Sequence, residues 1–87
     1  MKEVNLNFLL KGIDGKELDQ ANAGKLVAKL LAESNKGDAL KMFAWAKELH
    51  AGNTLKLDPS DVTTFKEFVL SNEFLTNLAK AQIVESL

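Results

Sequence analysis

The 87-residue sequence contains no cysteine, no arginine, one proline and one histidine. Without cysteine the chain has no disulfide, no thiolate metal site and no thiol nucleophile. Small secreted domains usually depend on disulfides, so this absence favours an intracellular domain held together by its core. Without arginine the chain also lacks the side chain that most often reads guanine and binds phosphate through a planar fork.

Long apolar runs are missing as well. No stretch of about 18 apolar residues could form a transmembrane helix, and Asn5 and Asn7 interrupt the apolar residues near the N-terminus, which is not typical of a signal peptide. We therefore expect a cytoplasmic protein without membrane contact. The length suffices for a single domain, residues 1–87, and not for two.

The charge pattern argues against nucleic acid as a partner. The net charge is −1, and the lysines are scattered along the chain, with only Lys25 and Lys29 on one face of a predicted helix. A nucleic-acid-binding domain usually carries a concentrated basic patch. Such a patch is not visible here.

The N-terminal residues predict a β-hairpin. Four apolar residues alternate with polar ones, which is the period of a strand with one buried face: Val4, Leu6, Phe8 and Leu10. A three-residue loop at 13–15, with Gly15 in the left-handed conformation, pairs Leu10 with Leu18 in a short second strand at 16–19. A further strand at 53–57 could join as a third, because a two-stranded hairpin alone is marginally stable.

Four short helices complete a predicted α+β fold. The first begins at the N-cap Asn22 and runs to Ser34, and the second follows Asp38 from Ala39 to Ala51. The third has the N-cap Asp58 followed by proline and runs to about residue 70. The fourth covers about 73–86 after a cap at 71–72. On the second helix one apolar stripe is predicted, made of Ala39, Met42, Phe43, Ala46, Leu49 and His50.

No residue pattern predicts catalysis, a cofactor or a metal site. His50 is the only histidine, has no partner spacing, and is best explained as a residue that completes a helix end. Gly24 and Lys25 lack the other residues of a phosphate-binding loop, so Gly24 is interpreted as a close-packing position. Asp58 and Asp61 fit a helix cap better than a carboxylate pair. We do not expect an enzyme.

The stronger candidates for a functional surface are apolar residues in excess of what a small core requires. Trp45 lies beside the core stripe of the second helix, where it either forms an interface or, as we favour, covers the core. The fourth helix is apolar around more of its surface than one core contact requires, so its excess faces either a partner or the core. The candidate interaction residues are Trp45, Phe74, Ile83, Val84 and Leu87.

Several tracts resemble those of short uncharacterised proteins found in bacteriophage and prophage genomes. The similar residues are 6–25, with GIDGKEL at 12–18 followed by ANAGKL, which extends to Leu26, and then 30–32, 36–38 and 78–82. These are turn and packing signals. The resemblance implies a phage-related origin, no particular activity and no functional residues.

Taken together, these features favour a small non-enzymatic module for protein–protein interaction or assembly, binding another protein or itself through an apolar surface. The alternative is a nucleic-acid-binding regulator that uses Lys25, Lys29 and Lys36 as a basic edge.

Overall fold

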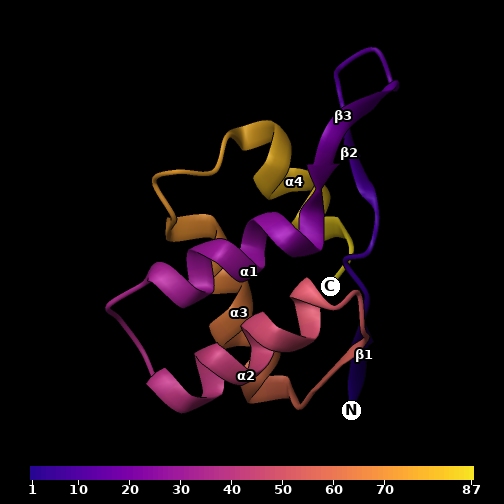
Figure 1. The fold of residues 1–87 in the computed structure, drawn as a ribbon. Helices are drawn as coiled ribbons and strands as arrows, with labels where there is room; N and C mark the ends of the chain where they lie inside the picture. Colours follow the sequence, from indigo (N-terminus) through magenta and orange to yellow (C-terminus); the bar gives the residue numbers. More distant parts are fainter.

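Two small antiparallel sheets and four helices make up the chain in the computed structural model, which describes residues 1–87 (Figure 1). The elements follow in the order β1 (Lys2–Val4), β2 (Leu9–Lys11), β3 (Glu17–Asn22), α1 (Ala23–Glu33), α2 (Ala39–His50), β4 (Leu55–Leu57), α3 (Pro59–Ser71) and α4 (Asn77–Glu85). The α+β class is confirmed. None of the helices combines the length and the apolar character needed to span a bilayer.

The predicted first strand is divided into two. Between β1 and β2 the Asn5 side chain accepts a hydrogen bond from the Asn7 backbone N–H at 2.9 Å, and the Phe8 N–H donates to the Leu6 carbonyl at 2.8 Å. These local bonds turn the chain, so β1 and β2 enter different sheets. The expected third strand exists as β4, but it pairs with β1, with Lys2 opposite Leu57, and is not part of the hairpin sheet.

The hairpin loop has the predicted form. The Gly12 N–H donates to the Lys16 carbonyl and the Gly15 N–H to the Gly12 carbonyl, both at 2.9 Å, and Gly15 has a φ of +82°. β3 is longer than expected, and its register with β2 is broken between Leu9 and Lys11. As a consequence Leu18, expected to face inward with Leu10, is 39% exposed.

Three helix N-termini carry the predicted caps. Asn22 accepts from the Lys25 N–H at 3.0 Å, Asp38 from the Lys41 N–H at 3.1 Å, and Asp58 from the Asp61 N–H at 2.7 Å. Each side chain satisfies a backbone donor that the helix itself cannot.

The start of the last helix differs from the prediction. Asn72 ends α3, and its side chain accepts from the Phe74 N–H at 2.8 Å, which forms a turn where a helix was expected. The cap is Thr76, which accepts from the Ala79 N–H at 3.2 Å. Phe74 and Leu75 therefore belong to the α3–α4 connection.

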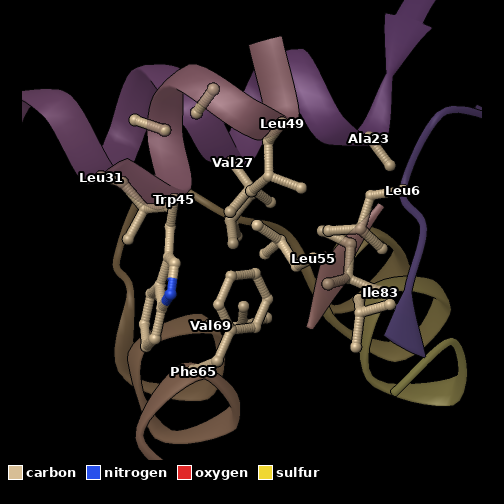
Figure 2. Close-up of a cluster of buried hydrophobic side chains, with 14 of the residues drawn as sticks. Leu6, Ala23, Val27, Leu31, Trp45, Leu49, Leu55, Phe65, Val69 and Ile83 are labelled. Carbon is tan, nitrogen blue, oxygen red and sulfur yellow. The ribbon is translucent and has the colours of Figure 1, made fainter. Parts of the chain in front are cut away.

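The core is formed by 18 buried hydrophobic residues from both sheets and all four helices. Phe65 is completely buried near its centre, and the Trp45 ring meets it edge to face with centroids 5.6 Å apart (Figure 2). This contact turns α2 away from its predicted orientation, since Phe43 and His50 are exposed while Trp45 is buried. The larger indole area accounts for the preference, and the Lys47 ammonium covers the Phe43 ring at 4.9 Å.

Two contacts fix the hairpin and α1 on this core. The Gln82 side-chain amide accepts from the Lys11 N–H at 2.7 Å and donates to the Lys11 carbonyl at 2.6 Å, so α4 holds β2 as a neighbouring strand would. At the start of α1 the Gly24 N–H donates to the Leu6 carbonyl at 2.8 Å. The expectation that Gly24 permits close packing is confirmed.

Candidate interaction groove

An open groove of about 1340 Å³ runs between α1 and the end of α3. We call it the α1–α3 groove. Its apolar lining consists of Leu26, Leu30, Met42, Phe68, Leu70 and Phe74. The elements that form it lie at the left of Figure 1, where the α3–α4 connection passes near α1.

The turn after α3 creates the most exposed part of this lining. Leu75 is buried and anchors the connection to the core, whereas its neighbour Phe74 is 82% exposed at the groove. Adjacent residues in such a turn point in different directions, so the burial of one side chain leaves the other in solvent. Leu70, the second-last residue of α3, is 49% exposed and also lines the groove.

Helix α1 supplies the opposite wall. Leu26 and Leu30 are one helical turn apart and therefore lie on the same side of the helix, where both are half-buried. The fully buried face of α1 contains Val27 and Leu31 instead. Leu26 and Leu30 thus extend the apolar face of α1 beyond the core and into the groove.

The two rims of the groove differ in charge. The α1 rim, which we define to include the exit of the helix, carries Lys29, Glu33 and Lys36, and the α3 rim carries Glu67 and Glu73. None of these five side chains forms an ion pair, because the only salt bridge joins Lys41 to Asp61 at 2.8 Å elsewhere on the surface. Of the predicted basic edge of Lys25, Lys29 and Lys36, only the last two line the groove, where Glu33 interrupts them and the opposite rim is acidic.

The five candidate interaction residues have different environments. Phe74 alone lies at the groove. Trp45 is 7% exposed and covers Phe65, the alternative we favoured, and Ile83 is completely buried. Val84 and Leu87 are half-buried and pack on the core. Most of the apolar excess of the last helix therefore faces the core.

Sequence reasoning did not identify Leu26, Leu30, Phe68 and Leu70 as groove residues. The available signal was the width of the apolar face on the first helix, where Leu26, Val27, Leu30 and Leu31 span more than the core covers. Only the placement of α3 decides which of these side chains remain open.

The residues considered for chemistry lie apart from one another. His50 is exposed at the end of α2, and Asp58 caps α3 by accepting from the Asp61 N–H at 2.7 Å. No charged or polar side chain is buried, and no three His, Asp or Glu side chains gather as metal ligands would.

One ionisable side chain has a perturbed pKa. A hydrogen bond from Lys41 to Asp61 and the charge of that carboxylate raise the pKa of the Lys41 ammonium above its ordinary 10.5. The pair joins α2 to the first turn of α3, so its role is to connect two helices.

The α1–α3 groove thus combines an apolar lining, an exposed aromatic residue and unpaired charges. Comparison of the chain with protein-family models, with curated proteins and with solved structures finds no match.

Proposed function

We propose that this chain is a small non-enzymatic interaction module that binds a protein through the α1–α3 groove. The observation that carries the proposal is Phe74, an aromatic side chain held 82% exposed at the edge of an apolar groove. Aromatic residues next to apolar pockets are typical anchors of protein interfaces. The proposal includes a cytoplasmic location and a phage or prophage origin, both of which rest on the sequence features given above.

The size of the groove favours a polypeptide over a small ligand. Its volume of about 1340 Å³ exceeds the roughly 300–1,000 Å³ that is usual for small-molecule pockets. Small-molecule sites also place a few polar groups so that they converge on the ligand, whereas the charges here lie on the two rims. An apolar centre with a charged rim is the arrangement of a protein interface.

Site-specific photo-crosslinking tests the proposal. The photoreactive amino acid p-benzoylphenylalanine replaces Phe74 in one variant and Ile13 in a control, since Ile13 is a 99% exposed apolar residue that does not line the groove. Illumination of cells of the source organism that express each variant is expected to give discrete protein adducts from position 74 and none from position 13. Absence of adducts at position 74, or the same adducts from both positions, would contradict the proposal.

A further inference from the structure

We propose that the partner in the α1–α3 groove is a second copy of this chain, bound as a twofold symmetric dimer. This inference rests on the proposed function, because it names the occupant of the same groove. Its basis is that the groove contains both halves of a complementary contact: Phe74 on the α3 rim, and an apolar wall formed by Leu26 and Leu30 on α1.

Symmetry determines which surfaces meet. In a twofold dimer each patch contacts a patch of the other copy, and the contact occurs twice. A twofold axis that lies in the interface and runs along the groove places the α3 rim of one copy against the α1 rim of the other. Phe74 then reaches Leu26 and Leu30 of the second copy, and the reverse contact forms at the same time.

The rim charges favour this arrangement. Glu67 and Glu73 of one copy face Lys29 and Lys36 of the other, so two acids meet two lysines on each side of the axis. Glu33 lies between the lysines and leaves the α1 rim with a net charge of +1 against −2 on the α3 rim. An axis across the groove would instead place like rims together. Opposite charges across an interface fix the register of association.

The available surface suits a modest dimer. A standard interface buries about 800 Å² on each partner, roughly one seventh of the 5749 Å² that the chain exposes. The groove and its rims cover only part of such an area, so we place the dimer at the weak end of the range, where association depends on protein concentration.

Sedimentation of the purified chain over a concentration series, up to about 1 mM, tests the dimer. We expect the average mass to rise toward twice 9.5 kDa. The variant Phe74→Glu is expected to stay monomeric, whereas the control Ile13→Glu, at a 99% exposed residue that does not line the groove, associates as the wild type does. A wild type that stays monomeric throughout, or a dimer that Phe74→Glu leaves intact, overturns the proposal.

A pair of charge-reversed variants tests the facing of the rims. Glu67→Lys/Glu73→Lys has lysines on both rims, and Lys29→Glu/Lys36→Glu has glutamates on both, so each variant alone is expected to associate at least about tenfold more weakly than the wild type. An equal mixture is expected to form a heterodimer, since every rim then meets its opposite. All four residues are exposed, and Trp45 fluorescence checks that each variant is folded. A mixture that remains monomeric overturns the proposal.

The two proposals fail separately. If position 74 crosslinks to another protein while the purified chain is monomeric, the groove binds a partner and the dimer is wrong. If position 74 gives no crosslink and the purified chain also stays monomeric up to about 1 mM, both are wrong.

Discussion

Replacing Gly24 by alanine tests how closely α1 packs on the rest of the chain. In an exposed helix this change stabilises by up to about 1 kcal/mol, because alanine has the higher helix propensity. Here the new Cβ would lie 3.1 Å from the Leu49 carbonyl oxygen, 3.2 Å from that of Leu6 and 3.3 Å from the Asn22 side-chain oxygen. The first two belong to the backbone of other elements, so they cannot move without shifting α2 or the segment before β2.

The expected sign of the stability change is therefore reversed. Overpacking of a tight contact costs about 1–3 kcal/mol. Displacement of α1 also stretches the 2.8 Å bond from the Gly24 N–H to the Leu6 carbonyl, a loss of about 1 kcal/mol. After subtraction of the propensity gain, we expect Gly24→Ala to lower the free energy of unfolding by about 2 kcal/mol, or to lower the melting temperature by about 8–16 °C.

Urea unfolding followed by Trp45 fluorescence measures this change, because Trp45 is the only tryptophan and packs on Phe65. The control is Ala32→Gly, at an exposed position of the same helix, which reports propensity without the contact and is expected to cost up to about 1 kcal/mol. If Gly24→Ala is as stable as the wild type or more so, the close-packing argument is wrong.

Three further changes probe local features. Gln20→Gly is expected to raise the free energy of unfolding by about 0.5–1 kcal/mol, because Gln20 has a φ of +58°, which is costly for any residue with a Cβ; a loss of stability in urea would contradict this. Asp58→Ala removes the cap of α3 and is expected to cost about 1 kcal/mol in thermal unfolding, so an unchanged melting temperature would count against the cap. Asp61 raises the pKa of Lys41 above 10.5. The Lys41–Asp61 pair therefore contributes its full stabilisation of the folded state below that value and loses it as pH rises through the pKa of Lys41 in the folded state. Lys41→Gln should therefore flatten the alkaline decline in stability measured from about pH 9 to 12, and an undiminished decline would refute the assignment.

The sequence predicted helix caps and the hairpin turn correctly, because in these features a residue interacts with the backbone of residues close to it in the sequence. Asn22, Asp38 and Asp58 cap helices as predicted, and Gly15 has the left-handed conformation that the three-residue loop requires. In each case the bond joins residues no more than four positions apart, so the sequence contains both partners. These signals were sufficient to predict the α+β class and the bounds of three helices.

The predictions were wrong where contacts between residues far apart in the sequence determine the structure. The strand at 55–57 pairs with β1 because Asn5 turns the chain before β2 begins, and a local pattern does not reveal which strand it will meet. The face of α2 is rotated because Trp45 meets Phe65 on α3. Phe74 was predicted from the sequence as a candidate interaction residue, but the groove that it lines depends on how α1 and α3 are placed. The periodicity of either helix alone does not specify that placement.

The pairing of β1 with β4 has a consequence for synthesis. Val4 is completely buried and lies opposite Leu55, so the first strand has no partner until the ribosome has added some fifty more residues. At about 5–20 residues per second, this segment waits about 3–10 s, during which the hairpin, α1 and α2 are synthesised. β1 thus depends on a partner made some fifty residues later, and only α3 and α4 follow that partner in the chain.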